Sequence, residues 1–278
     1  MAMVDQYCVN VVLQEVFNSE DVGKPQNMND NPESTTQDVI LGDRLSLVQP
    51  KGGYRFSVDA LLLAHFAAVK PGNRVVDLGT GVGVVALALA LKMEHGRVIA
   101  VELQSRLADL ARINALDNRV GAEVEVLEKD WTELTATDVG GPADHVVANP
   151  PYRRLGSGRI NPEDEKARAR HEINGNADTC IAAAGRLLRS GGLFSVIYPA
   201  VRMAGLFYSL RETGLEPKRL RNIHSRQGEE AKLVLAEARK DSGEGLVIEP
   251  PLYMYQGQKG RDYTPEASAI IQGTGLGV

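Results

Sequence analysis

The chain has 278 residues, of which 43% are hydrophobic and 24% are charged, and its formal net charge is −5. These values are typical of a globular protein with one large domain and argue against wholesale disorder. The negative balance argues against a general nucleic-acid coat, because phosphate binding relies on Lys and Arg, although a local basic surface is still allowed.

Targeting and metal signals are also missing from the sequence. No apolar run approaches the roughly 18 residues needed to span a bilayer, and the N-terminus lacks the basic-then-apolar layout of a secretory signal. The two cysteines, Cys8 and Cys180, and the five histidines show no metal-ligand spacing. We therefore expect a cytoplasmic protein with reduced thiols and no metal centre.

The N-terminal segment differs in composition from the rest of the chain. Asn18–Asp38 is rich in Asn, Asp, Glu, Ser and Pro and has few large apolar residues, which predicts a flexible lead-in. Tyr7–Phe17 alternates apolar and polar residues in part, so a strand, a short helix and residual tail all stay open. We assign residues 1–38 to a flexible N-terminal extension and residues 39–278 to a single domain.

The first elements expected after the extension are a strand over Gly42–Gln49, a turn over Pro50–Gly53 and a helix over Ser57–Val69. Ser57 is a suitable N-cap for that helix. From Pro71 onward, strand-like and helix-like runs alternate along the sequence. The strand-like runs are Arg74–Leu78, Arg97–Val101, Glu123–Leu127, Ala143–Ala148, Gly192–Ile197, Glu216–Ile223 and Lys232–Ala238. The helix-like runs are Gly83–Met93, Gln104–Leu116, Ala177–Leu188 and Ala200–Thr213.

This alternation predicts an α/β fold of the Rossmann-like kind, with a mostly parallel seven-stranded sheet and helices on both faces. Gly191-Gly192 after Arg189 predicts a helix stop and a turn. We find no internal repeat and no heptad run.

A glycine-rich turn follows the first strand of the alternating region. Gly79, Gly81 and Gly83 allow a ligand to approach the backbone and the start of the next helix, because they lack Cβ. A dinucleotide fingerprint would place glycine or alanine at position 84, where this chain has Val84. The G-x-G-x-G spacing with Asp77 before it is typical of S-adenosylmethionine binding, since a carboxylate can accept from the amino group of that cofactor directly or through water.

Acidic residues also end the next two strands. Glu102 lies about twenty residues after the glycines, where a carboxylate can accept from both ribose hydroxyls. Asp130 can accept from the adenine amino group, and Trp131 can pack on the ring. Taken singly, each of these acids is equally compatible with a cap at a strand end. Their order along successive strand ends favours a cofactor site, and the neighbouring Thr80 and Leu103 are included in it.

The sequence Asn149-Pro150-Pro151-Tyr152 follows an apolar run that predicts a buried strand. Methyl transfer to an exocyclic amine is difficult because the nitrogen lone pair is delocalised into the ring. The Asn149 side-chain carbonyl and the Pro150 backbone carbonyl can accept from the two N–H bonds and direct the lone pair at a methyl donor. Pro151 stiffens the turn, and Tyr152 offers a flat face for stacking. The alternative is a plain turn after a strand.

A basic, glycine-containing loop comes next and can contact phosphates while a base turns out of its stack into the site. Its candidate residues for RNA are Arg153, Arg154, Arg159, Lys166, Arg168, Arg170 and His171. The acidic residues Glu163, Asp164 and Glu165 dilute this charge, so a solvated surface is the alternative. A second basic set is equally compatible with an extended RNA surface and with a solvated face; it consists of Lys218, Arg219, Arg221, His224 and Arg226.

These motifs resemble those of amino-group methyltransferases that act on adenine, guanine or glutamine amides. The segment Gly53–Ala64 is similar to the one that precedes the cofactor motif in the bacterial tRNA1(Val) adenine-N6 methyltransferases, which modify the adenine next to the anticodon. The similarity continues through Arg168–Glu172 and His224–Arg226 and covers roughly residues 40 to 265. The long N-terminal lead departs from that family, and we assign it no role.

The resemblance implies roles for several residues. Those matching Asp77 and the three glycines hold the methionine part of S-adenosylmethionine, those matching Glu102 and Asp130 hold its ribose and adenine, and those matching Phe56 and Asp59 lie near its pocket. The expected activity is N6-methylation of an adenine in tRNA. Other acceptors, namely an rRNA guanine or adenine or a protein glutamine amide, stay open. A nicotinamide oxidoreductase and a non-catalytic RNA-binding module are the remaining alternatives.

Overall fold

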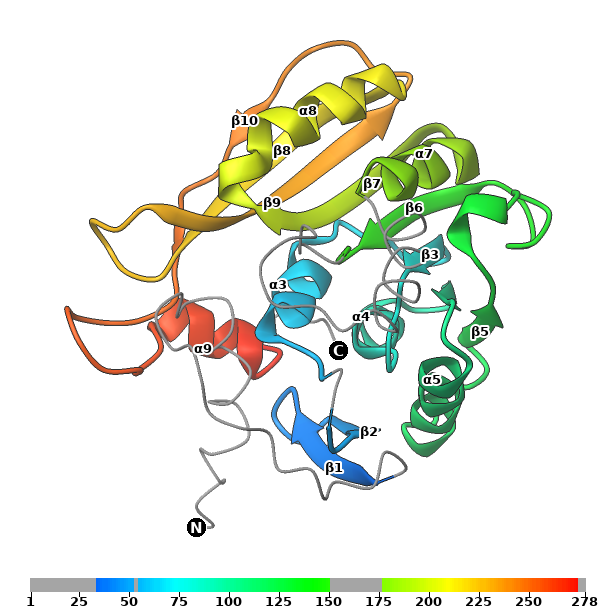
Figure 1. Ribbon diagram of the computed structural model, residues 1–278, viewed down its shortest axis with the longest axis horizontal. Helices are drawn as coiled ribbons and strands as arrows, with labels where there is room; N and C mark the ends of the chain where they lie inside the picture. Colours follow the sequence, from blue (N-terminus) through cyan, green and yellow to red (C-terminus); the bar gives the residue numbers. More distant parts are fainter. Residues whose placement is uncertain (1–33, 53–54, 151–176, 275–278) are drawn as a thin grey trace, which may run out of the picture.

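The computed structural model describes residues 34–52, 55–150 and 177–274 and is built around a nine-stranded sheet (Figure 1). The strands follow the order β10-β8-β9-β7-β6-β3-β4-β5, and β11 also pairs with β8. Every pairing in this sheet is parallel except those of β9, which is antiparallel to both β7 and β8. The strands are β3 (Arg74–Leu78), β4 (Arg97–Glu102), β5 (Val124–Glu128), β6 (Ala143–Ala148), β7 (Leu188–Pro199), β8 (Leu215–His224), β9 (Ala231–Lys240), β10 (Val247–Ile248) and β11 (Leu252–Tyr253).

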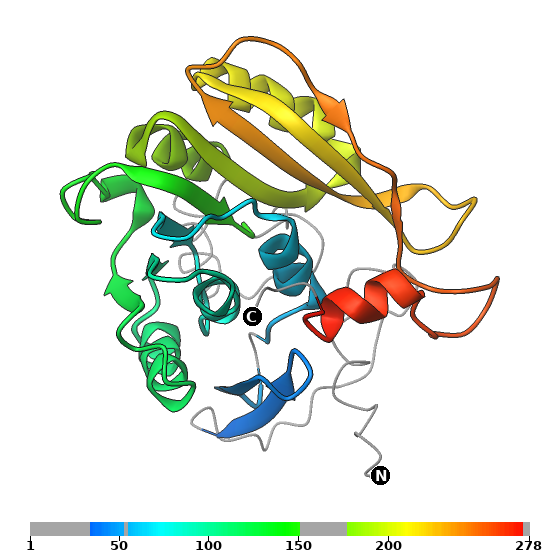
Figure 2. The ribbon, with the colours of Figure 1, turned by 180° about the vertical axis from the view of Figure 1, so that it is seen from behind.

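Helices cover both faces of this sheet (Figures 1 and 2). One hydrophobic cluster joins α3, α4 and α5 to one face, and a second joins α7 and α8 to the other. The helices are α3 (Val58–Phe66), α4 (Val84–Lys92), α5 (Ser105–Asp117), α7 (Ala177–Leu187), α8 (Met203–Glu212) and α9 (Pro265–Ile271), with the short 3-10 helices η1 (Trp131–Glu133) and η2 (Ala200–Arg202). The expected α/β architecture is therefore confirmed, but the described sheet has nine strands rather than the expected seven, because the short strands β10 and β11 pair with the outer side of β8.

Helix α4 shows why a nearly uniform apolar sequence forms a helix here. All of its residues from Val84 to Ala90 are buried, so it has no solvent-facing stripe. It contacts α3 and the N-terminal strand β2 on one side and the strands β3, β4 and β5 on the other. A helix that is apolar all round is stable only when it is covered in this way. The glycine-rich turn that precedes α4 is thereby fixed to the core.

The expected strand bounds hold at the centre of the sheet and shift elsewhere. β3 and β6 have the predicted bounds. The expected turn at Gly191-Gly192 is wrong, because α7 ends at Leu187 and β7 begins at once with Leu188. Gly191 has a φ of 74°, and the register with β6 shifts between Ala143 and His145, so the two glycines form an irregularity inside the strand.

An N-terminal hairpin lies outside the main sheet, next to α4 and α5 (Figure 1). It consists of β1 (Thr35–Ile40) and β2 (Leu45–Pro50), which pair antiparallel. Because β1 begins at Thr35, the expected boundary at residue 38 falls inside a paired strand and has to move toward the N-terminus. The Asp38 carboxylate accepts from the guanidinium of Arg55 at 3.0 Å, so this residue belongs to the folded domain. The remainder of the predicted extension, residues 1–33, lies outside the described residues.

Candidate functional site

Strand register brings the predicted site residues to one edge of the sheet. Leu78 at the end of β3 pairs with Val101 of β4 and with Ala148 of β6. The next residues, Gly79 and Asn149, therefore leave neighbouring parallel strands at the same level, about 5 Å apart. Glu102 ends β4 beside them. This carboxyl edge is where open α/β sheets bind ligands.

The glycine-rich turn at this edge depends on the absence of side chains. Gly79, Gly81 and Gly83 have φ values of 73°, 59° and 94°, which other residues adopt only with strain. A Cβ on Gly79 would also lie 2.9 Å from the ring of Trp131. Gly83 is the N-cap of α4, so the helix starts directly behind the turn. The turn is thus held in one shape that side chains at these positions would strain or obstruct.

Asp77 is turned into the protein rather than toward the edge. Its carboxylate is fully buried, accepts from the Thr80 hydroxyl at 2.6 Å, and takes a backbone hydrogen bond from Ala86 in the first turn of α4. Burial raises its pKa to about 7, with a smaller contribution from the charge of Glu102. Asp77 therefore shapes the glycine-rich turn, and its predicted contact with the cofactor amino group stays a prediction.

Glu102 joins the glycine-rich turn to the start of α5. One carboxylate oxygen accepts from the backbone N–H of Gly81 and the other from that of Gln104, each at 2.9 Å. A carboxylate has about four acceptor positions, so each oxygen can accept one further hydrogen bond. That remaining capacity is what the predicted contact with two ribose hydroxyls requires. The neighbouring Leu103 exposes 42% of its surface at the same place.

Asp130 and Trp131 form the third part of the predicted cofactor site. One oxygen of Asp130 accepts from both the backbone N–H and the hydroxyl of Thr132, at 2.8 Å each. The Trp131 ring lies against Gly79, and its Nε1 donates to the Thr179 hydroxyl at 3.2 Å. Trp131 therefore packs against the glycine-rich turn, while its packing on an adenine ring stays a prediction.

The first turn of α3 contributes one unusual carboxylate. Asp59 is 2% exposed, and its Oδ1 is buried without a hydrogen-bond partner in the described part of the chain. Burial raises its pKa to about 6, opposed in part by a hydrogen bond from Ser57. Phe56, half-buried, packs against the core of this face. An unsatisfied buried acceptor beside the first turn of a helix is suited to a ligand that donates hydrogen bonds.

Asn149 and Pro150 are the part of the proposed acceptor site that the structure describes. Asn149 is partly exposed and Pro150 is buried directly after β6. Pro151, Tyr152 and the basic loop residues Arg153, Arg154, Arg159, Arg168, Arg170 and His171 lie outside the described residues. Their assigned roles stay predictions.

The second basic set does not form one free surface. Lys218 donates to the carbonyls of Gly243 and Glu244, and Arg219 is ion-paired with Glu237 and Glu249. Arg221 pairs with Glu266 and donates to Pro250. These three side chains make contacts within the fold, and the choice between an extended RNA surface and a solvated face stays open.

Arg226, at the carboxyl edge, is the member of that set assigned to RNA. Its guanidinium lies 5.2 Å from the Tyr255 ring centre and donates to the Gly260 carbonyl, and its side chain is 18% exposed. Contact with RNA through this residue stays a prediction.

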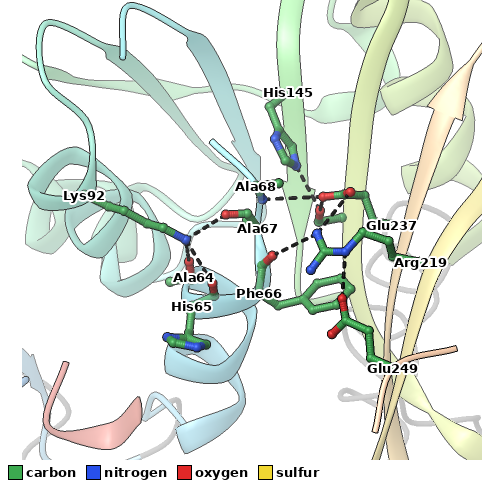
Figure 3. A network of polar contacts seen from close by, with 11 residues as sticks. Ala64, His65, Phe66, Ala67, Ala68, Lys92, His145, Arg219, Glu237 and Glu249 are labelled. Atoms are coloured by element: carbon green, nitrogen blue, oxygen red, sulfur yellow. Dashed lines mark hydrogen bonds and ion pairs between the residues drawn. The ribbon is translucent and has the colours of Figure 1, made fainter. Parts of the chain in front are cut away.

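Sequence reasoning missed a buried polar network between α3 and the sheet (Figure 3). The Glu237 carboxylate accepts from Arg219 at 3.2 Å, from the Ser195 hydroxyl at 3.2 Å and from the backbone N–H of Ala68 at 3.4 Å. His145 lies 2.9 Å from the Ser195 hydroxyl. Lys92 donates to three carbonyls at the end of α3, those of Ala64, His65 and Ala67.

This network, His145–Ser195–Glu237, has the residue types of a hydrolase triad but not its arrangement. In a triad the imidazole lies between hydroxyl and carboxylate, whereas here the Ser195 hydroxyl lies between the other two. All three side chains are buried. Burial lowers the pKa of His145 to about 3, so the ring stays neutral and is a weak proton acceptor near neutral pH. The network is structural.

Metal-binding and membrane-spanning features are absent from the described residues. No group of three or more His, Cys, Asp or Glu side chains is placed there to hold a metal ion. Within the same ranges, no helix combines the length and apolarity that crossing a membrane requires.

Comparison with known proteins identifies the family. The family model of the methyltransferase small domain matches residues 57–206, which include α3, the glycine-rich turn and Asn149. The chain belongs to the methyltransferase small domain family. The cofactor of this family is S-adenosylmethionine. No observation therefore favours the alternative of a nicotinamide oxidoreductase.

Individual relatives agree with this family. The chain is 27% identical over 208 residues to a tRNA1(Val) (adenine(37)-N6)-methyltransferase of Porphyromonas gingivalis, covering 73% of this chain and 81% of that protein. It is 32% identical over 182 residues to the enzyme of the same name from Aeromonas hydrophila, covering 65% and 75%. Among solved structures, a predicted O-methyltransferase from Agrobacterium tumefaciens matches with a TM-score of 0.63 and 28% identity, over 79% of this chain and 97% of that one.

The residues of this methyltransferase fit its cofactor. S-adenosylmethionine supplies a methyl group on a positively charged sulfur. Glu102 keeps spare acceptor positions beside the glycine-rich turn, and the first turn of α3 has a buried Asp59 oxygen without a partner among the described residues. These residues would hold the ligand at the carboxyl edge, next to Asn149.

Proposed function

We propose that this methyltransferase methylates the N6 amino group of an adenine in tRNA, at the position next to the anticodon of a tRNA1(Val)-type substrate. The observation that carries the proposal is the adjacency of Asn149-Pro150 to the glycine-rich turn across paired strands β6 and β3. Support for the substrate comes from the relatives, whose names specify adenine 37 of tRNA1(Val). A tRNA substrate agrees with the expected cytoplasmic location.

The proposed roles at the acceptor follow from hydrogen-bond chemistry. The Asn149 side-chain oxygen and the Pro150 carbonyl accept from the two N–H bonds of the amine, which favours a tetrahedral nitrogen with its lone pair turned toward β3. Tyr152 stacks on the base. An amide is preferable to a carboxylate in this role, because positive charge develops on the nitrogen only during transfer and no prior deprotonation is needed. Proximity and orientation then supply most of the rate.

The proposed substrate contacts are electrostatic. Arg153 and Arg154 follow the acceptor motif directly in the sequence and Arg159 comes soon after, which supports a role for them in contacting the RNA around the methylated base. Phosphate contacts of this kind position an RNA without reading its sequence. A base in an RNA loop is already partly unstacked, which lowers the cost of turning it into the site. Arg168, Arg170, His171 and Arg226 extend the proposed surface.

Other acceptors use the same chemistry and are separated by experiment. Purified enzyme and S-adenosylmethionine labelled on the methyl group are incubated in parallel with a tRNA1(Val) transcript, rRNA and a protein extract. The expected result is label in the transcript, recovered as N6-methyladenosine by nucleoside mass analysis.

The matched control for this experiment is the same transcript with guanine in place of adenine 37. We expect this change to abolish incorporation. Label that persists in the guanine transcript, or that appears only in rRNA or protein, would overturn the proposed substrate while leaving the methyltransferase assignment intact. Label on a hydroxyl would favour the O-methyl chemistry named for the Agrobacterium tumefaciens protein.

A further inference from the structure

The N-terminal hairpin is connected to the cofactor site by a buried side chain that does not itself reach the edge. Asn114 on α5 is 0% exposed. Its amide oxygen accepts from the Val48 backbone N–H at 2.7 Å, and its amide nitrogen donates to the Val48 carbonyl at 2.9 Å. The same nitrogen donates to the carbonyl of Val82 at 2.9 Å. Val82 lies between Gly81 and Gly83, inside the glycine-rich turn.

At the C-cap of α5, one turn after Asn114, Asn118 makes the same contact with the hairpin. Its oxygen accepts from the Ser46 N–H at 2.8 Å, and its nitrogen donates to the Ser46 carbonyl at 2.7 Å. Together the two side-chain amides hydrogen-bond the backbone N–H and C=O groups of Ser46 and Val48, on the edge of β2 that does not face β1. A third strand would bond to that edge in the same way. The Asn118 nitrogen also donates to the Asn114 carbonyl of its own helix. Among the described residues, the hydrogen bonds of Asn118 therefore reach the hairpin but not the glycine-rich turn.

The hairpin also holds the segment that leads into α3. Gln49, 1% exposed, accepts at Oε1 from the backbone N–H of Phe56 at 3.2 Å and donates from Nε2 to the Asp38 carboxylate. Arg55 donates to the same carboxylate and to the Thr36 hydroxyl. The hairpin thus contacts, through buried amides, both segments that frame the cofactor side of the edge.

We propose that the β1–β2 hairpin is a positioning element of the cofactor site and that Asn114 is the positioning residue that transmits its effect to the glycine-rich turn. The turn can hold its ligand-binding shape only while the Val82 carbonyl stays in place. The two hydrogens of the Asn114 amide fix that carbonyl to Val48. The proposal concerns cofactor binding and does not depend on which acceptor is methylated.

The proposal predicts a coupling that runs in both directions. If the hairpin supports cofactor binding through Asn114, then bound cofactor stabilises the hairpin by the same factor. A merely structural amide would lower thermal stability but would leave the cofactor affinity of the folded protein unchanged.

The test compares Asn114→Ala with Asn118→Ala in the full chain. Each variant loses a pair of hydrogen bonds to β2, but only the first also loses the contact with Val82. Calorimetry with S-adenosylhomocysteine gives the affinity, and steady-state kinetics give kcat and KM for S-adenosylmethionine. We expect Asn114→Ala to weaken the affinity about tenfold relative to Asn118→Ala, the size of effect of one lost charge-neutral hydrogen bond with an unpaired buried partner, and to raise KM with kcat at saturation retained.

Equal affinities of the two variants would overturn the proposal, whatever their melting temperatures. If Asn114→Ala does not fold, amide hydrogen exchange of the unmodified protein decides. S-adenosylhomocysteine should slow exchange of the Val48 amide, whose hydrogen bond is to Asn114, more than that of the Ser46 amide, whose hydrogen bond is to Asn118. Equal slowing, or none, would reject the coupling.

Discussion

Two buried acidic side chains, Glu102 and Glu237, show how the carboxyl edge differs from the polar network under α3. Both are almost inaccessible, at 6% and 3% exposure. Glu237 is surrounded by donors of the protein itself, a guanidinium, a hydroxyl and a backbone N–H. Glu102 receives one backbone N–H on each oxygen and keeps acceptor capacity on both. Burial alone therefore does not distinguish the two carboxylates; they differ in how much hydrogen-bond capacity is left for a ligand, and the ribose contact of Glu102 stays a prediction.

The difference follows from position in the sheet. The network lies among strands β6, β7, β9 and β8 and the C-terminal end of α3, where a buried charge has to be paired (Figure 3). At the edge, backbone groups leave the ladder and can be shared with a ligand. Substitutions in the two regions should therefore separate activity from stability.

Asn149→Ala should have the largest effect on activity. The substitution removes the amide proposed to orient the acceptor nitrogen, and loss of one such preorganised group typically lowers kcat by about 100-fold to 1000-fold. Cofactor affinity and melting temperature should change little, because Asn149 is partly exposed and follows the end of β6. Methyl incorporation into tRNA, with S-adenosylhomocysteine calorimetry as the control, measures both. An active Asn149→Ala enzyme would refute the assigned role.

Glu237→Ala should lower stability rather than the activity of the folded enzyme. The change leaves the Arg219 guanidinium without its buried partner and the Ser195 hydroxyl without its acceptor. Removing one member of a buried pair costs about 3 kcal/mol of unfolding free energy, measured by urea denaturation. Glu249→Ala is the matched control, since it removes the more exposed partner of the same guanidinium and should cost less than about 1 kcal/mol. Equal losses of unfolding free energy in the two variants would show that the buried ion pair stabilises the fold no more than the exposed one.

The sequence allowed the centre of the sheet and the cofactor edge to be predicted because their signals are local. A short apolar strand followed by closely spaced glycines is compatible with few structures besides a ligand-binding turn, and β3 and β6 have the predicted bounds. The network was invisible because His145 lies within an apolar run, and its partners come from β7 and β9, 50 and more residues away. β1 was missed because it begins with four polar residues, Thr35–Asp38, two of which are held by side-chain contacts rather than by a hydrophobic pattern.

Asn114 illustrates the same limit. It lies on an amphipathic helix whose pattern gives no sign that one amide bridges a hairpin 66 residues earlier and a turn 32 residues earlier. Asp77 was predicted from the motif, yet its orientation into the protein follows from the Thr80 hydroxyl and the start of α4. Local sequence locates such residues, but only the packed fold shows which of their atoms are already used.

Asp59 is the case that sharpens the comparison, because it is as buried as Glu237 yet has an oxygen without a partner among the described residues. Burial raises its pKa to about 6 in the fold, above the value of about 3.9 in an unfolded chain. The folded state therefore holds this proton more tightly than the unfolded state. The resulting stability is fully present below about pH 4 and is lost as the pH rises through 6.

Asp59→Asn removes that dependence while keeping the shape of the side chain. The unfolding free energy of the unmodified protein should fall relative to the variant by up to about 3 kcal/mol between pH 4 and pH 7.5, measured by urea denaturation without cofactor. The difference between the two proteins cancels the contributions of Asp77 and the histidines, which both retain. Parallel pH profiles would mean that Asp59 ionises as freely in the fold as in the unfolded chain. A falling difference would show that the burial of the Asp59 carboxylate costs stability in the absence of a ligand.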